Sequence, residues 1–198
     1  LYRVDTITGE ILAEGTMDHK SSFSITPPTY ANGMVFVALS NGCVQAFNAR
    51  TLESLWIYYD PLGGQPNCPI AVKDGYLYTG FWNSETGNAR FVCLSITDEY
   101  PGETMEEKCA SWFYTAKGGF YWAGAYVGND FVLVGTDDGD NTCTERTSRL
   151  LLLDTKTGKL LDSWDNLHGD IRSSVVYDSA TNAYYFTAKG GTFYGLQV

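Results

Sequence analysis

The sequence lacks the apolar runs that mark membrane proteins and helical bundles. No run approaches the roughly 18 apolar residues of a membrane span. No segment sustains the 3.6-residue apolar period of an amphipathic helix. The first residues also lack the basic and apolar regions of a signal peptide. We therefore expect almost no helix and no membrane span in this segment. Any targeting signal is expected upstream, because the sequence begins inside a repeat.

Basic residues are scarce. The chain has 13 Lys and Arg against 23 Asp and Glu, which gives a formal net charge of −10. A negative field repels phosphate backbones, and no basic cluster interleaved with aromatic residues offsets it. Nucleic acid is therefore excluded as a partner.

The five cysteines are odd in number and lack CxxC spacing, which argues against a zinc site. Cys93 and Cys109 flank an insertion between two expected strands. Two states remain open for them, a disulfide across that hairpin or reduced, partly buried thiols.

The sequence does contain a repeated strand–turn–strand segment. Residues 1–12 and 150–161 have similar sequences. Equivalent positions follow one another at intervals of 43 to 59 residues, and the longer intervals contain polar insertions. They are Asp5, Asn48, Ser95, Asp154 and Gln197. A period in the low forties with this core predicts a four-stranded propeller blade.

Two further apolar segments precede each reference position. They are joined by short turns such as Asn32-Gly33 and Asp74-Gly75. Asn-Gly and Asp-Gly favour tight hairpins because both residues tolerate positive φ. Each repeat therefore supplies four strands, and the fold class is an all-β propeller of four-stranded antiparallel blades.

The repeat boundaries predict one propeller domain, or a propeller fragment, over residues 1–198 with about four blades. Three complete blades are expected at 27–59, 68–116 and 119–165. A fourth is split between the termini and combines 171–198 with 10–15. Because the third strand of a blade occurs at both ends of the chain, an arc of a larger seven- or eight-bladed propeller also explains the pattern.

The run Ala46–Trp56 resembles the A-x-D-x-x-T-G-x-x-x-W signature of pyrroloquinoline-quinone-like propeller repeats. That superfamily includes quinoprotein alcohol dehydrogenases and the propeller lipoprotein of the outer-membrane assembly machinery. Asn48 replaces the Asp and Leu52 the Gly, whereas Thr51 and Trp56 match. We expect the Asp or Asn to accept N–H groups of the turn and the Trp to pack between blades.

The resemblance implies a quinone held by a Trp floor and a lid of two adjacent disulfide-bonded cysteines, with a calcium ion bound by Glu, Asn and a catalytic Asp. The sequence has no adjacent cysteines, and no matching calcium ligand set can be assigned. It also has too few repeats for the eight-bladed ring of those enzymes. We therefore expect no quinone-dependent activity and no organic cofactor.

Acidic residues gather in two polar segments. Asp137, Asp138 and Asp140 offer oxygen ligands at close spacing, and they form either a solvated acidic loop or a calcium site without the twelfth-position Glu of an EF-hand. Residues 103–108 are expected to be an exposed polar insertion.

Aromatic residues and the two histidines are the candidate ligand-binding residues. Trp82, Tyr121 and Trp122 lie in connections near the expected channel mouth, where they suit peptide or carbohydrate recognition. The alternative role of these aromatic residues is packing between blades. His19 and His168 lie in loops between blades, either solvated or at the mouth, without a recognisable triad.

These observations favour a non-catalytic binding or scaffolding propeller from a bacterial secreted, cell-surface or periplasmic protein. Its partner would be a protein. The alternatives are recognition of a glycan or small molecule at the channel mouth and an enzyme of unassigned class. Incomplete blades at the chain ends also predict self-association.

Overall fold

The computed structural model describes residues 1–19, 26–137 and 147–198. These residues form strands and connecting turns without a helix, which confirms the all-β prediction. None of the described segments is a helix long and apolar enough to cross a membrane.

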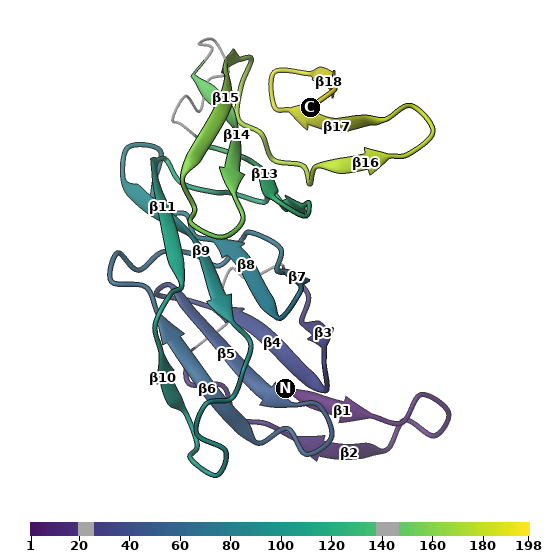
Figure 1. Cartoon of the computed structure of the whole chain (residues 1–198). Helices are drawn as coiled ribbons and strands as arrows, with labels where there is room; N and C mark the ends of the chain where they lie inside the picture. The colour runs from purple at the N-terminus through teal and green to yellow at the C-terminus, as the bar shows by residue number, and fades with distance from the viewer. Residues whose placement is uncertain (20–25, 138–146) are drawn as a thin grey trace.

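The strands form successive antiparallel sheets along an open arc (Figure 1). A two-stranded N-terminal ribbon comes first, with β1 (Tyr2–Val4) and β2 (Ile11–Glu14). The first sheet contains β3 (Thr29–Ala31), β4 (Met34–Leu39), β5 (Cys43–Asn48) and β6 (Ser54–Tyr59), with β10 (Glu106–Lys108) added at its edge. The second contains β7 (Ala71–Lys73), β8 (Tyr76–Gly80), β9 (Asn88–Ser95) and β11 (Trp112–Lys117). The third contains β12 (Tyr126–Val127), β13 (Phe131–Gly135), β14 (Ser148–Asp154) and β15 (Leu160–Leu167). The fourth has three strands, β16 (Val176–Asp178), β17 (Ala183–Ala188) and β18 (Thr192–Leu196).

The first, second and third sheets each pack on a neighbour through both faces. In β4, Phe36 and Ala38 belong to the core shared with the second sheet, whereas Val37 and Leu39 belong to the core shared with the ribbon. In β14, Leu151 and Leu153 pack toward the second sheet and Leu150 toward the fourth. Side chains alternate across a strand, so a strand between two cores must be apolar at consecutive positions. The four-leucine run 150–153 is therefore the mark of a blade sandwiched by its neighbours.

The reference positions of the repeat organise their turns as predicted. The Asp154 carboxylate accepts the N–H groups of Lys156 and Thr157 at 3.0 and 2.8 Å, and Asp5 accepts those of Ile7 and Thr8 at 2.9 and 2.8 Å. Asn48 accepts those of Arg50 and Thr51 in the same way. These bonds satisfy donors that the tight turn leaves without a strand partner.

The tryptophans join neighbouring sheets, as the repeat signature predicts. The Trp56 indole, fully buried in β6, donates to the Ile96 carbonyl of the second sheet at 3.4 Å. Trp112 in β11 donates to the Thr155 carbonyl of the third sheet at 2.8 Å. A Cβ added at Gly158 would lie 2.4 Å from the Trp112 ring, so the turn glycine also makes room for the tryptophan.

Two expectations about the ends and insertions need correction, and one open alternative is resolved. The insertion expected to be exposed contains β10, which pairs in parallel with β6 and leaves Glu106 and Lys108 at 9% and 6% exposure. Cys93 is buried and Cys109 exposed, and both are free, so the disulfide alternative is not realised.

The split blade is not formed within the chain. The β2 strand pairs with β1 in the ribbon, and the fourth sheet ends at β18 without a fourth strand among the described residues. Figure 1 shows the ribbon and the fourth sheet at opposite ends of the arc. Self-association through these incomplete sheets stays a prediction.

Candidate functional site

Connections of the second, third and fourth sheets meet at the same end of their strands. Neighbouring antiparallel strands run in opposite directions, so the turn between the middle strands of a blade and the connection to the next blade leave at the same end. Backbone bonds join these segments directly. Phe120 N–H donates to the Phe81 carbonyl at 2.9 Å, Asp137 N–H to Gly119 at 2.9 Å and Val175 N–H to Gly124 at 3.0 Å.

Three of the predicted ligand-binding residues come together there with an arginine. The rings of Trp82 and Tyr121 lie 5.0 Å apart, and Tyr121 stacks on Trp122 at 4.4 Å between centroids. The Arg172 guanidinium lies 4.6 Å from the Tyr121 centroid and 5.7 Å from that of Trp122. We call these four residues the aromatic platform. Stacking and cation–π contacts of this kind fix the orientation of long side chains.

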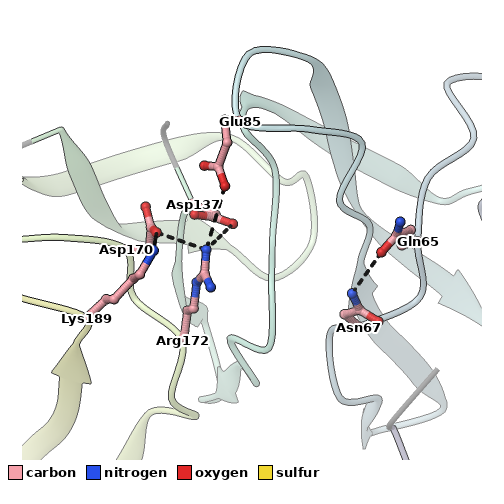
Figure 2. A network of polar contacts seen from close by, with 7 residues as sticks. All are labelled: Gln65, Asn67, Glu85, Asp137, Asp170, Arg172 and Lys189. Carbon is pink, nitrogen blue, oxygen red and sulfur yellow. Dashed lines mark hydrogen bonds and ion pairs between the residues drawn. The ribbon is translucent and has the colours of Figure 1, made fainter. Parts of the chain in front are cut away.

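The same arginine lies against three carboxyl groups. Its Nη2 atom is 3.0 Å from Asp170 Oδ2, 3.5 Å from Asp137 Oδ2 and 3.8 Å from Glu85 Oε1. Lys189 Nζ lies 3.7 Å from Asp170 Oδ2. Figure 2 shows Glu85, Asp137 and Asp170 approaching one another around the end of Arg172. Glu85, Asp137 and Asp170 form the carboxyl cluster.

Burial controls the electrostatics of this cluster. Asp137 and Asp170 are fully buried, so the expectation of a solvated acidic loop is wrong for Asp137. Burial is the main cause that raises the pKa of Asp137 to about 8, and the adjacent Asp170 carboxyl acts in the same direction against the opposing effect of Arg172. A carboxylate taken out of water loses hydration that two cations restore only in part.

Among the described residues, the carboxyl cluster is a group that could hold a cation. One oxygen from each of Glu85, Asp137 and Asp170 lies within 4.8 Å of the other two. Asn67 and Gln65, which share a hydrogen bond of 3.3 Å, stand apart from the cluster in Figure 2. Of the predicted calcium ligands only Asp137 can be placed, because Asp138 and Asp140 lie outside the described residues.

The two predicted histidines are elsewhere. His19 lies in the β2–β3 connection, 2.6 Å from Asp18 Oδ2 and next to the Tyr59 ring. His168 lies in the β15–β16 connection, where its backbone N–H donates to the Tyr194 hydroxyl at 3.1 Å. His19 contacts the first sheet through Tyr59, whereas His168 contacts the fourth through Tyr194, so the two histidines are not brought together at one site.

Sequence reasoning missed Glu85, Asp170, Arg172 and Lys189. They lie in short connections without a recognisable motif around them, and Asp170 and Arg172 share one connection. The signal that could have found them is their position, because charged residues in equivalent connections of consecutive blades are brought to the same end of the sheets.

The residues of the site do not fit the quinone that the family resemblance implies. Tyr121 lies over Trp82 with the ring centroids 5.0 Å apart and stacks on Trp122 at 4.4 Å, so these rings contact one another where a planar cofactor would have to insert. The sequence also offers no adjacent cysteines for a lid.

Comparison with family models and with curated proteins gives no match. Solved structures do match. The computationally designed Ika4 protein is 16% identical, with a TM-score of 0.67 over 96% of this chain and 99% of that chain. BamB from Moraxella catarrhalis is 17% identical, also with a TM-score of 0.67 over 96% of this chain but 50% of that chain. Quinohemoprotein alcohol dehydrogenase from Comamonas testosteroni is 15% identical, with a TM-score of 0.59 over 81% of this chain and 28% of that chain.

The chain therefore spans half the length of BamB and a smaller part of the dehydrogenase. At these identities the likeness concerns the fold alone. Together with the antiparallel four-stranded sheets, it shows that this chain has a β-propeller fold of the kind found in BamB and in quinohemoprotein alcohol dehydrogenases.

Proposed function

We propose that this chain is a non-catalytic binding propeller that engages a protein partner through the aromatic platform. The observation that carries the proposal is the state of Trp122. Its side chain is 37% exposed, and its backbone is held at φ 61°, in the left-handed region that bulky residues avoid. Such a conformation costs roughly 1–2 kcal/mol, and strained exposed residues concentrate at binding sites.

The composition of the platform supports recognition of a protein. Tryptophan, tyrosine and arginine are the residues most enriched among those that dominate binding energy at protein interfaces. The Arg172 guanidinium is held by stacking and by ion pairs, so little side-chain freedom would be lost when a partner docks.

A glycan or small molecule is the second candidate, because flat aromatic faces beside polar groups also suit sugar rings. Both candidate functions use the same residues, so they can be distinguished only by identifying the ligand. The resemblance to scaffolding propellers supports the protein partner. We also propose a bacterial secreted, cell-surface or periplasmic location, which rests on that resemblance.

A site-specific cross-linking experiment tests the protein partner. A photoreactive phenylalanine analogue replaces Trp122 in one variant and Phe193, an aromatic 67% exposed in β18, in a matched control. We expect cross-links to a defined protein from position 122 and not from position 193. The captured protein, once purified, should bind the native chain and bind Trp122→Ala roughly tenfold or more weakly. Equal affinity for the native chain and Trp122→Ala would refute the proposal.

A glycan array tests the second candidate. Binding of the native chain that is lost in Trp122→Ala, with an unchanged circular dichroism spectrum, would replace the protein partner by a glycan. Absence of a signal on a broad array would remove the glycan.

A further inference from the structure

The carboxyl cluster has oxygens that Arg172 does not use. Arg172 and Lys189 approach Asp170 through Oδ2, and Arg172 approaches Asp137 through Oδ2 and Glu85 through Oε1. The opposite oxygens, Asp137 Oδ1, Asp170 Oδ1 and Glu85 Oε2, are buried and have no hydrogen-bond partner among the described residues. Buried acceptors without a partner are rare in folded proteins, because each has lost its hydration without gaining a hydrogen bond.

The three carboxyl groups belong to three different connections, and one oxygen of each lies within 4.8 Å of the other two. Glu85 follows β8, Asp137 follows β13 and Asp170 precedes β16. Atoms at most 4.8 Å apart have a common centre about 2.8 Å or less from each, and calcium–oxygen distances are about 2.3–2.6 Å. Small side-chain movements would bring the three oxygens to calcium, whereas magnesium, at about 2.0–2.1 Å, would require a larger contraction.

The charges of the cluster also favour an added cation. Three carboxylates face two cationic side chains, Arg172 and Lys189, so ionised carboxylates leave the cluster with an excess of negative charge. Arg172 contacts one oxygen of each carboxyl group and also packs on the Tyr121 ring. The contact with Tyr121 limits how far the guanidinium can turn toward the other oxygens. A carboxylate can accept an arginine on one oxygen and a metal on the other.

We propose that Glu85, Asp137 and Asp170 bind a calcium-sized divalent cation through the oxygens that Arg172 leaves unused. The ion would tie together connections of the second, third and fourth sheets, directly behind the aromatic platform. The set shares only Asp137 with the acidic run recognised in the sequence. It also holds the ion without a quinone, and the proposal does not depend on the proposed partner.

Calcium titration by isothermal calorimetry tests the site, with terbium luminescence excited through tryptophan as a second readout. Trp122 and Tyr121 contact Arg172, so terbium in the cluster would lie close enough to be sensitised. We expect a dissociation constant of roughly 10⁻⁴–10⁻³ M, because the ligands are few and two cations compete with the ion. Magnesium should bind roughly tenfold more weakly.

Three variants decide whether these residues are the ligands. Asp137→Asn and Asp170→Asn should each weaken calcium binding roughly tenfold or more, and Glu85→Gln should do the same. Because Glu85 is partly exposed, its variant retains the fold even if the buried ones do not. Asp154→Asn, at a surface turn, is the matched control and should bind as the native chain does.

Arg172→Gln tests whether the carboxyl cluster binds a metal ion or has its negative charge neutralised by Arg172 alone. Removal of the competing charge should tighten calcium binding several-fold and should make calcium protect this variant against unfolding more than it protects the native chain. The proposal is overturned if the native chain shows neither heat nor sensitised luminescence up to about 10 mM cation, well above the expected constant. It is also overturned if Glu85→Gln binds calcium as tightly as the native chain.

Discussion

Two aspartates of the third sheet, Asp154 and Asp137, have opposite environments although both lie at or just beyond the end of a strand. Asp154 ends β14, accepts two backbone N–H groups and the Thr157 hydroxyl, and has its pKa lowered mainly by these bonds from Thr157. Asp137 comes two residues after β13, is fully buried, and has its pKa raised to about 8. The turn aspartate is stabilised by donors from its own segment, whereas the cluster aspartate depends on residues from distant segments. A carboxylate whose hydrogen-bond donors come from its own turn is part of the scaffold, whereas one that lacks such local donors belongs to the candidate site.

The largest expected effect comes from removing the cation on which the cluster depends. Arg172→Ala should lower the free energy of unfolding by roughly 3–5 kcal/mol, because it leaves buried carboxyl groups without their main partner. Lys156→Ala, beside Asp154, should change it by less than about 0.5 kcal/mol, as exposed pairs contribute little. Urea unfolding measures both. Similar losses in the two variants would mean that the cluster is not buried in solution.

A change of pH should act on Asp137 in a defined direction. Its folded-state pKa is raised, so the stability that its bound proton provides is complete below pH 4 and is lost as pH rises toward 8. The side chain that Asp137→Asn introduces carries no charge. At pH 8.5 and in the presence of a chelator, the free energy of unfolding of this variant should therefore be roughly 1–3 kcal/mol higher than that of the native chain. Thermal unfolding between pH 4 and 9 measures the effect. A difference that stays constant with pH would contradict the raised pKa.

The turn aspartate should respond in the opposite sense. The pKa of Asp154 is lowered in the folded chain, so its contribution is present above pH 4 and is lost as pH falls through its folded-state value. Asp154→Asn should therefore be slightly less stable than the native chain at neutral pH and indistinguishable from it in acid. Unfolding curves at pH 7 and pH 2.5 check this, and a larger loss in acid than at pH 7 would count against it.

The smallest expected effect concerns a single hydroxyl. Thr157→Val removes the 2.7 Å bond from Thr157 Oγ1 to Asp154 and should cost about 0.5–1 kcal/mol. Thr115→Val is the matched control, because Thr115 is exposed on β11, where valine is well tolerated. Denaturant midpoints at pH 7 measure both. A native midpoint for Thr157→Val would show that the turn does not need its hydroxyl.

The fold was predictable because its determinants are local. The turn at Asp5 and the turn at Asp154 are each closed by residues within three positions, so the same letters give the same turn twice. The run 150–153 also shows in the sequence that β14 is buried on both faces. By contrast, β10 is a three-residue strand in a polar insertion, and its partner β6 lies far earlier in the chain. No periodicity could have indicated it.

The site was predictable only in part, for the same reason. Trp82, Tyr121 and Trp122 could be recognised because aromatic residues in connections are conspicuous. The ion-pair partners Glu85 and Arg172 lie 3.8 Å apart across two sheets, and only the folded arc brings them together. Leu52 illustrates the limit from the scaffold side. It occupies the glycine position of its turn at φ 60° and is tolerated because it is buried against the first sheet and the ribbon.

The parallel pairing of β10 with β6 has a consequence for how the chain resists aggregation. A bare outer strand can act as a template on which other chains add, but the outer strand of the first sheet is occupied by a segment of the second. Fibril growth from β6 would first require residues 106–108 to detach, with Lys108 leaving its position 5.3 Å from the Trp56 ring. The insertion thus covers the edge of β6 and keeps other chains from pairing with it.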